Sequence, residues 1–251
     1  MELGNTIYRN DIGKIVTKEE FEQEWQKFEK NVNEAYDLIA NKIISEINFS
    51  THNDIQKLWL LYDYLTKENM KYNIQDTVLD GKWANDVQYD FPPYKNWKIS
   101  HSTKYPALLN NSGVCKTYAL AFEDLANKLG IPCRVITGYT GMEHAWNIVL
   151  ISGEIKHIDV SYALMRRSFT NKKDFFLKSL DELIQNSGSR TVNEYDKLIN
   201  DMINPQIKVI SRSDKENKPQ ITIIQKSSNE IEPKITILNK KEFPEIKSIK
   251  R

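Results

Sequence analysis

Residues 113–129 read GVCKTYALAFEDLANKL, and this stretch decides how the rest of the chain is interpreted. Its apolar side chains recur at helical spacing, so that one face carries Tyr118, Phe122, Leu125, Ala126 and Leu129. Gly130 then supplies a C-terminal stop, and Pro132 prevents the helix from continuing. We therefore expect a helix over residues 114–129 whose first turn carries Cys115.

The position of Cys115 at a helix start bears on its reactivity. The thiolate is the nucleophilic form, and an ordinary cysteine with a pKa of about 8.5 is mostly protonated at neutral pH. A helix N-terminus lowers that pKa, because its unpaired N–H groups and its dipole favour negative charge. Cys115 is therefore a candidate nucleophile whose own N–H is placed to hold an oxyanion, and Gly113 would let the backbone bend around a substrate carbonyl. The alternative is a structural cysteine.

Three runs after the helix have the composition of strands: residues 134–139, 144–151 and 155–160. Residues 152–153, Ser-Gly, are typical of a tight hairpin turn between the last two runs. This turn places His144 opposite Ser161 and Trp146 opposite Asp159. His144 and Asp159 are then diagonal neighbours on one face, with about 5–8 Å between their backbones. The hairpin thus predicts a contact between imidazole and carboxylate.

A thiol nucleophile needs a base, which is usually a histidine oriented by a third group. His144 is the candidate base and Asp159 the candidate orienting group, provided that the helix packs on the hairpin and brings Cys115 beside them. Taken singly, each has a plainer explanation, as a capping or surface histidine and as a solvated charge at a strand end. His157 lies on the strand face of Asp159 and competes as base or as a supporting partner. Cys133 begins a strand and is expected to be buried and unreactive.

Four blocks of the sequence resemble the core of the transglutaminase-like superfamily. They are GVCKTYA (113–119), LGIPCRV (129–135), HAWN (144–147) and HIDVSY (157–162). The superfamily has a G-x-C-x-x-[YF]-A helix start, an H-A-W-N strand start and a D-x-[TS]-[WY] strand end, in the same order and spacing. Residues 62–65 and 105–109 resemble bacterial members more weakly, so the resemblance spans residues 55–165 or so. Ser161 and Tyr162 stand where members often carry Thr and Trp.

The resemblance implies a papain-like α+β fold, in which the nucleophile lies at a helix N-terminus packed on an antiparallel sheet. It implies that Cys115 is the nucleophile, His144 the base and Asp159 the orienting group. The implied function is thiol-dependent hydrolysis of a peptide or amide bond through a Cys acyl-enzyme, as in a bacterial cysteine peptidase with a protein or peptide substrate. Acyl transfer or deamidation at protein glutamine, with the same triad, remains an alternative. So does a non-catalytic binding module on the same fold.

Residues 73–101 lose their periodicity but stay rich in aromatic side chains. Structureless segments of this length inside a compact domain are usually functional or disordered, and the aromatic content argues against disorder. Trp97 and Tyr94 are therefore candidates for binding the substrate or the oxyanion, with hydrophobic packing as the alternative. Trp146, two residues after the candidate base, is a third candidate for substrate binding.

The flanks of the candidate domain have simpler patterns. Residues 17–20, TKEE, form a capping box that precedes a long amphipathic helix. Further helices are expected over residues 53–70, 174–186 and 192–203. Residues 219–226 nearly repeat as 233–240, which predicts two short strands that extend the sheet or form a small tail module. We therefore expect an N-terminal helical segment (1–50), a catalytic domain (51–204) and a β-rich extension (205–251).

The composition argues against several classes of protein. The 251 residues are 40% hydrophobic and 27% charged with a net charge of +1, so nothing favours binding to nucleic acid or an anionic membrane. No apolar run reaches the roughly 18–20 residues that span a bilayer, and residues 1–10 do not resemble a signal peptide. The sequence as given indicates the cytoplasm, or secretion or the cell surface if a leader was removed. No cofactor or metal motif is present, and two cysteines are too few for a disulfide framework or a closed zinc site.

Overall fold

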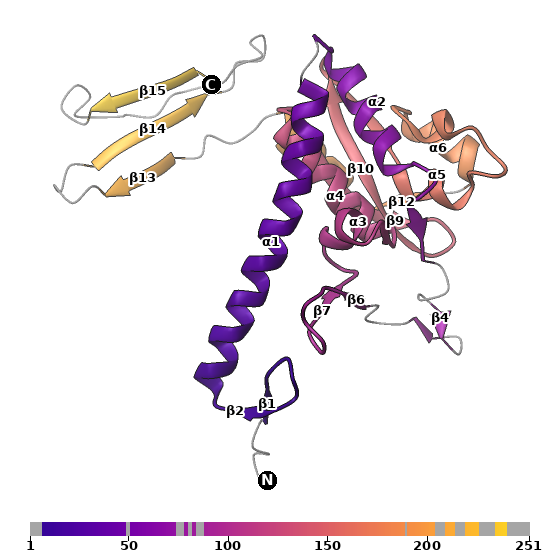
Figure 1. Ribbon diagram of the computed structural model, residues 1–251. Coiled ribbons are helices and arrows are strands. Elements are labelled where there is room, and N and C mark those ends of the chain that lie inside the picture. Colours follow the sequence, from indigo (N-terminus) through magenta and orange to yellow (C-terminus); the bar gives the residue numbers. More distant parts are fainter. Residues whose placement is uncertain are drawn as a thin grey trace, which may run out of the picture. The chain divides into compact units, whose positions relative to one another are not determined.

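A computed structural model describes residues 7–48, 51–73, 88–188 and 190–203, together with the backbone of short strands at 78–79, 82–83, 209–213, 219–225 and 234–239. The chain divides into two compact units, residues 1–195 and 196–251. The first unit combines helices with a four-stranded antiparallel sheet (Figure 1). The predicted α+β class is confirmed.

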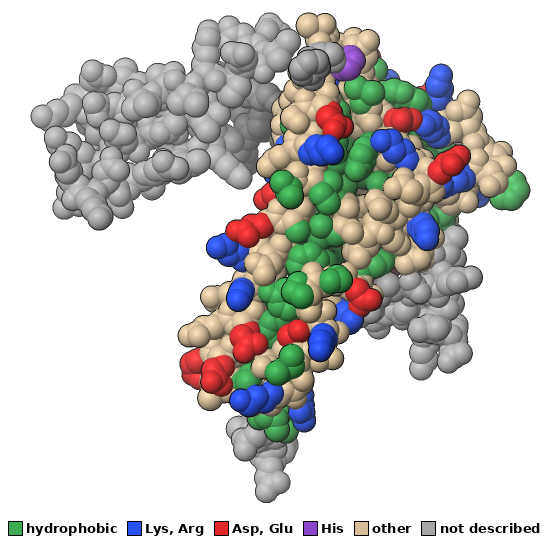
Figure 2. Space-filling view, in the orientation of Figure 1, with side chains coloured by type: hydrophobic (Ala, Val, Ile, Leu, Met, Phe, Trp, Pro, Cys, Tyr) green, Lys and Arg blue, Asp and Glu red, His purple; other side chains and the backbone are tan. Residues whose placement is uncertain are grey.

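The first unit starts with a small hairpin and a long helix. β1 (Tyr8–Arg9) pairs with β2 (Ile15–Val16), and α1 (Lys18–Asn48) follows. The predicted capping box begins α1, because the Thr17 N–H donates to Glu20 Oε2 at 2.9 Å and the Glu20 N–H donates to Thr17 Oγ1 at 3.2 Å. Figure 2 shows hydrophobic side chains along one side of α1 and charged side chains along its outer edge. The buried side chains of α1 keep helical spacing: Phe28, Val32, Tyr36, Ala40, Ile43 and Ile47.

Short elements fill the segment between α2 (Asp54–Leu65) and α4 (Cys115–Lys128). In chain order they are β3 (Lys71–Tyr72), β4 (Val78–Leu79), β5 (Lys82–Trp83), β6 (Gln88–Asp90), β7 (Lys98–Ser100), α3 (Tyr105–Leu109) and β8 (Ser112–Gly113). β4 pairs with β5 and β6 with β7, whereas β3 runs parallel to β8 with Tyr72 opposite Gly113. The last pairing brings Tyr72 beside the start of α4.

The main sheet has the strand order β11-β10-β9-β12. The three predicted strands are confirmed as β9 (Cys133–Tyr139), β10 (Glu143–Ile151) and β11 (Glu154–Ile158), and α4 packs on β9 and β10 (Figure 1). Residues 152 and 153 make the predicted turn, with φ angles of 53° and 81°. Because Asn147 pairs with Ile158, the register continues to Trp146 opposite Asp159, as predicted.

The chain after Asp159 departs from the predicted elements. The strand expected to reach residue 160 ends at Ile158, because α5 (Val160–Met165) begins there with Asp159 as its N-cap. The helix expected over 174–186 is divided into η1 (Lys172–Phe175) and α6 (Leu180–Ser187), and a capping box of Ser179 and Glu182 starts α6. The last helix, α7 (Tyr195–Ile203), starts later than predicted, because β12 (Thr191–Val192) first pairs with β9.

The second unit contains a three-stranded antiparallel sheet of β13 (Val209–Ser213), β14 (Pro219–Gln225) and β15 (Lys234–Asn239). The two near-repeats of the sequence form β14 and β15, which pair with Ile221 opposite Leu238. These strands therefore make a sheet of their own rather than an extension of the main sheet. The predicted boundaries after residues 50 and 204 stay predictions. Within the part of the chain that the structure describes, no helix is long and apolar enough to cross a membrane.

Candidate active site

Cys115 is the first residue of the 14-residue helix α4, directly after the extended N-cap residue Val114. Thr117 fixes this turn, because its hydroxyl accepts the Val114 N–H at 3.3 Å and donates to the His101 carbonyl. A Cβ on residue 113 would lie 2.6 Å from Thr117 Cγ2, so packing requires Gly113. The glycine that we expected to bend around a substrate thus lets Thr117 hold the start of α4. The thiol lies at the positive end of the helix dipole.

His144 and Asp159 are in direct contact. His144 Nε2 lies 2.9 Å from Asp159 Oδ2, and the two side chains are 2% and 0% exposed. The Cys115 thiol and the His144 ring lie close enough for each to shift the pKa of the other. Since Nε2 faces the carboxylate, Nδ1 is the ring nitrogen left for the thiol. The structure therefore brings the three predicted residues together, while their catalytic roles stay predictions.

Both oxygens of Asp159 are fully engaged. Oδ1 accepts from the Ser161 hydroxyl and from the Tyr162 N–H, each at 3.0 Å. Oδ2 faces His144 Nε2 and also accepts from Arg190 Nη1 at 2.8 Å. Burial alone would raise the pKa of this carboxyl, but the charges of His144 and Arg190 and the Tyr162 N–H hold it well below its usual range. Asp159 is therefore a carboxylate.

The surroundings lower the pKa of the Cys115 thiol and raise the pKa of the His144 imidazole. Burial alone would raise the pKa of the Cys115 thiol, yet the hydrogen bond and charge of His144 and the Ala145 N–H lower it below its ordinary value. Burial alone would lower the pKa of the His144 imidazole, yet the charge and hydrogen bond of Asp159 raise it to about 9. Both shifts favour a thiolate beside an imidazolium at neutral pH, which is the reactive form of the thiol.

Two further residues reach the site without any signal in the sequence. The Tyr72 hydroxyl lies beside Cys115, whose thiol and backbone N–H both act on the pKa of this hydroxyl. Burial and the neighbouring charge of Cys115 raise the pKa of this hydroxyl, so it keeps its proton. Arg190 reaches Asp159 from the residue before β12. β3 and β12 are two-residue strands, too short to show periodicity, so only the folded chain reveals either contact.

Trp97 and Tyr94 lie in an aromatic cluster against α1. The Trp97 ring is 5.4 Å from that of Trp25 and 5.7 Å from that of Phe28, measured between centroids. The Tyr94 ring lies 4.8 Å from that of Phe28, and its hydroxyl accepts a hydrogen bond from Asn31. Large rings gain most by burying apolar area, and α1 offers it here. The structure therefore packs both rings against α1, and their predicted role in substrate binding stays a prediction.

Trp146 and His157 form a separate chain of hydrogen bonds behind the triad. Trp146 Nε1 donates to His157 Nδ1 at 3.0 Å, and His157 Nε2 lies 2.7 Å from the Tyr195 hydroxyl. Burial, and then the charge of Arg190, lower the pKa of His157 to about 4, so its ring is neutral at pH 7. The buried Trp146 ring stacks on His144 and supports it from within, and its predicted contact with a substrate stays a prediction. This arrangement favours His144 over His157 as the base.

Cys133 is buried, as predicted, and both cysteines are free. Burial, and then the neighbouring charge of Glu123, raise the pKa of the Cys133 thiol well above its ordinary value. The side chain of Asn127 bonds the Cys133 backbone at both ends, with its Oδ1 accepting the N–H and its Nδ2 donating to the carbonyl, each at 3.1 Å. This thiol is therefore held in its protonated form.

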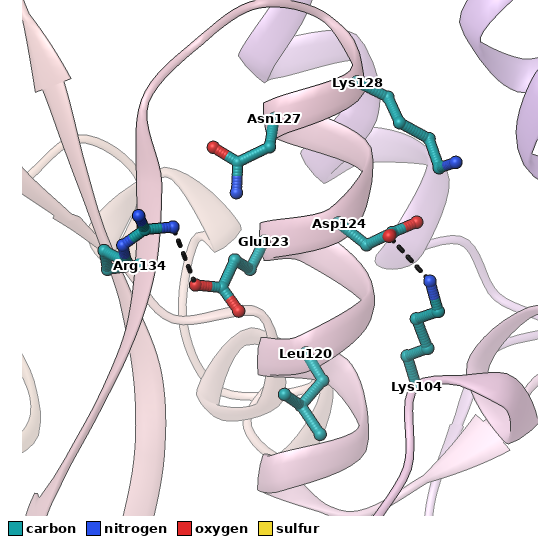
Figure 3. A pocket seen from close by; sticks show the side chains of 7 residues that line it. All are labelled: Lys104, Leu120, Glu123, Asp124, Asn127, Lys128 and Arg134. Atoms are coloured by element: carbon teal, nitrogen blue, oxygen red, sulfur yellow. Dashed lines mark hydrogen bonds and ion pairs between the residues drawn. The ribbon is translucent and has the colours of Figure 1, made fainter. Parts of the chain in front are cut away.

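A hollow of about 510 Å³ lies beside the later turns of α4 (Figure 3). Its charges are paired, Arg134 with Glu123 at 3.7 Å and Lys104 with Asp124 at 2.6 Å. None of the triad residues lines it, so it supplies no substrate site for the thiol. Among the described residues, no group of three His, Cys, Asp or Glu side chains is arranged to hold a metal ion.

The fold and the site together define a class: an α+β domain with a papain-like core and a cysteine at the N-terminus of a helix that packs on an antiparallel sheet. The model of the transglutaminase-like superfamily matches residues 39–160, which include Cys115, His144 and Asp159. This part of the chain belongs to the transglutaminase-like superfamily, and the predicted family is confirmed.

Two solved structures are similar to the chain at low identity. One is described as a "TGase", with 16% identity, a TM-score of 0.40, and coverage of 59% of this chain and 39% of that chain. The other is a "Putative Cysteine Protease from Cytophaga hutchinsonii", with 16% identity, a TM-score of 0.36, and coverage of 63% of this chain and 49% of that one. The alignment thus spans less than half of either solved chain. No curated protein matches the sequence.

Proposed function

We propose that this chain is a thiol-dependent hydrolase that cleaves a peptide or amide bond through an acyl-enzyme on Cys115. The observation that carries the proposal is the contact of His144 with both partners, the Cys115 thiol on one side and Asp159 Oδ2 at 2.9 Å on the other. Thiol acyl chemistry needs this combination of a nucleophile, a base within hydrogen-bond reach and a third group that orients the base.

The first half of the proposed reaction acylates the thiol. The Cys115 thiolate attacks the carbonyl carbon of the substrate, a C–S bond forms, and the carbonyl oxygen becomes an oxyanion. When the oxyanion collapses, the C–N bond breaks and the His144 imidazolium gives its proton to the leaving amine. Asp159 holds the imidazole in the correct orientation throughout. A thioester and a neutral imidazole remain.

Water completes the reaction. Neutral His144 takes a proton from a water molecule while the water oxygen attacks the thioester carbonyl. The C–S bond then breaks, the carboxylic acid leaves, and the thiolate is restored beside the imidazolium. Each proton that His144 gives to the amine is thus recovered from water, and the protein ends the cycle unchanged.

The oxyanion has two candidate donors, the Cys115 N–H and the Tyr72 hydroxyl. Both groups lie at the start of α4, and a substrate oxygen that enters between them would accept from both. The backbone around Tyr72 is fixed, because the Tyr118 hydroxyl donates to the Lys71 carbonyl at 2.7 Å and the Lys71 N–H donates to the Asn111 carbonyl at 2.8 Å. We therefore assign the side-chain part of oxyanion stabilisation to Tyr72.

Acyl transfer or deamidation at glutamine would use the same triad, and the difference lies in which molecule attacks the thioester. Water at its bulk concentration wins unless the site excludes it or binds an amine specifically. A dry tunnel built by the aromatic stretch from Trp83 to Trp97 would favour the amine, and two rings of that stretch, Tyr94 and Trp97, pack against α1 instead. Hydrolysis is therefore the leading function, with transfer as the alternative.

A non-catalytic binding module is the third possibility. The ionised groups at the site are fully buried, since the side chains of Asp159 and Arg190 are both 0% exposed. Burying such charges costs several kcal/mol of desolvation, and apolar residues of the same volume often stabilise a fold as well or better. A surface that only binds a partner has no need of this arrangement, which supports catalysis.

Trapping the acyl-enzyme tests the proposal. The protein and a Cys115→Ala control are incubated with a peptide library, quenched in acid and digested, and the mass of each cysteine-containing peptide is measured. We expect an acyl group on Cys115 and none on Cys133 or on the control. Absence of any acylated Cys115 over a broad panel would favour the binding module.

A second assay separates hydrolysis from transfer. It offers a glutamine-containing protein and a fluorescent primary amine, with and without EDTA, and follows both amine incorporation and new peptide termini. We expect new termini without incorporation, unchanged by EDTA. Incorporation without cleavage would replace the hydrolase with the transferase.

A further inference from the structure

Arg190 is a buried arginine that reaches the triad because two strands, β12 and β9, approach each other unusually closely. β12 follows Arg190 directly and pairs with β9 so that Val192 lies opposite Gly138. A Cβ on residue 138 would lie 1.8 Å from the Thr191 carbonyl oxygen and 2.9 Å from Trp146 Cη2. Only glycine at position 138 therefore lets β12 come this close, and this approach delivers Arg190 to Asp159.

The guanidinium of Arg190 contacts two aromatic rings and two polar side chains. Its Cζ lies 5.0 Å from the centroid of the Trp146 ring and 4.6 Å from that of the Tyr162 ring, as in cation–π contacts. Nε donates to Ser187 Oγ at 2.8 Å, and Nη1 donates to Asp159 Oδ2 at 2.8 Å. Nη2 is buried and donates to none of the described residues. Burying a guanidinium with one unpaired donor costs folding free energy, so stability alone does not explain why Arg190 lies at the triad.

Arg190 bonds the same oxygen of Asp159 as His144 does. Its Nη1 and His144 Nε2 both bond Oδ2 of Asp159, at 2.8 and 2.9 Å. A carboxylate oxygen that already accepts from a permanent cation attracts a second proton less strongly. Asp159 is meanwhile held in place from its other oxygen by Ser161 and Tyr162, so its orientation does not depend on Arg190 alone.

We propose that Arg190 is a positioning residue that shares Asp159 Oδ2 with His144, weakens the hold of the carboxylate on the imidazole proton, and so makes the imidazolium a stronger acid toward the leaving amine. The proposal rests on the hydrolase function above. Without Arg190, Asp159 would hold the proton on His144 too firmly, and protonation of the leaving amine would slow. Proton transfer is most efficient when the pKa of the acid is near the working pH.

Other titratable groups also face this pair, and they must be kept unchanged in a test. They come from α4, β3, β11, α5 and α2 and are Cys115, Tyr72, His157, Tyr162 and Tyr62. None of these five carries a permanent positive charge, whereas Arg190 does at every accessible pH. A change at position 190 alone therefore isolates the effect of that charge.

The test measures the pKa of His144 directly. The chain has 4 histidines, so ring ¹⁵N signals of histidine-labelled protein can be assigned with a His144→Ala variant and followed against pH. The variants are Arg190→Gln, which removes the charge but keeps a donor, and Arg190→Lys, which keeps the charge. Arg134→Gln is the matched control, because it removes a guanidinium whose partner is Glu123.

In Arg190→Gln we expect the midpoint of His144 to rise from about 9 by about one pH unit, a tenfold gain in proton affinity. In Arg190→Lys and Arg134→Gln it should stay near the wild-type value. A residue with only a structural role would lower the melting temperature in both Arg190 variants and leave the midpoint alone. An unchanged or lower midpoint in folded Arg190→Gln therefore overturns the proposal.

If Arg190→Gln does not fold, Arg190→Met replaces it, because a flexible apolar chain fills the space between Trp146 and Tyr162. The same rise in the midpoint is expected, and the same null result counts against the proposal. The titration needs no substrate, so it can fail while acyl-enzyme is still trapped on Cys115. Conversely, an inert Cys115 with a raised His144 midpoint in the variant would remove the hydrolase function and leave the charge effect standing.

Discussion

The two cysteines of the chain flank α4, one in its first turn and one at the start of β9, and they differ in almost everything that sets the reactivity of a thiol. Cys115 begins the helix and lies beside His144, whereas Cys133 follows the end of the helix and lies beside Glu123. Burial would raise the pKa of both thiols, but it prevails only at Cys133. Burial alone therefore keeps a thiol protonated and unreactive, whereas a cationic partner favours the nucleophilic thiolate.

The two buried histidines repeat the same contrast. His144 lies against a carboxylate, and its pKa is raised to about 9. His157 is bonded to Trp146 and Tyr195 instead, and burial with the charge of Arg190 lowers its pKa to about 4. Charged partners decide which form of a buried group is present, so the variants below remove those partners one at a time.

The largest effect is expected from His144→Ala. Removing the histidine of a serine-protease triad costs about 10⁶-fold in turnover, and we expect a loss on that scale here, since the variant lacks both the base and the cation that holds the thiolate. Turnover of the best substrate from the trapping screen gives the measurement. His157→Ala is the matched control and should lose less than about tenfold, as it leaves the Cys115–His144 contact in place. A larger loss in the His157 variant would reverse the assignment of the base.

Asp159→Asn should have the next largest effect, a fall in turnover of about 10⁴-fold. In serine triads the same change has that size, because the amide stabilises the wrong tautomer of the imidazole and no longer favours its cation. Steady-state kinetics and thermal melting of the same samples are compared with the wild type. Near wild-type turnover with an unchanged melting temperature would show that Asp159 acts only as the N-cap of α5 and does not orient the base.

Tyr72→Phe should lower kcat by about 10²–10³-fold, the usual cost of one oxyanion donor. The ring stays in its packing site and only the hydroxyl is lost, so the melting temperature should change little. Tyr94→Phe is the control, because that hydroxyl meets Asn31 in the cluster against α1. Equal kcat values for both variants would leave the Cys115 N–H as the oxyanion donor and remove Tyr72 from the mechanism.

Local patterns predicted the parts of the site that lie within one helix or one hairpin. The spacing around Cys115 marks the start of α4, and the Ser-Gly turn fixes the register that sets His144 against Asp159. Tyr72 and Arg190 could not be predicted, since each depends on a two-residue strand pairing between distant segments. The sequence left open whether Tyr94 and Trp97 pack in the interior or bind a substrate. An aromatic loop looks functional in sequence when the helix that covers it lies far away in the chain.

The smallest expected effect is a loss of folding stability at acid pH, which comes from His157. Because the pKa of His157 is lowered to about 4 from an ordinary value of about 6.5, the unfolded chain takes up a proton over this range that the folded chain refuses. The unfolding free energy should therefore fall as pH drops from about 6.5 to 4, by up to about 3 kcal/mol.

Urea unfolding of the wild type and of His157→Gln at several pH values measures this contribution. The variant should lose part of the acid sensitivity in that window and keep the wild-type trend above pH 7, where the raised pKa of His144 acts on both proteins equally. Identical slopes between pH 6.5 and 4 would mean that His157 accepts its proton in the folded state as readily as in the unfolded one.

The contrast between Cys115 and Cys133 is tested most directly by brief alkylation with iodoacetamide at pH 7, followed by peptide mapping. In denaturant both cysteines should label equally, which calibrates the reagent. In the folded protein Cys115 should react at least about 100-fold faster than Cys133, because its thiolate is held by His144 while Cys133 stays protonated. Equal rates for the two thiols in the folded protein, or a faster Cys133, would contradict the account of an activated nucleophile at the start of α4.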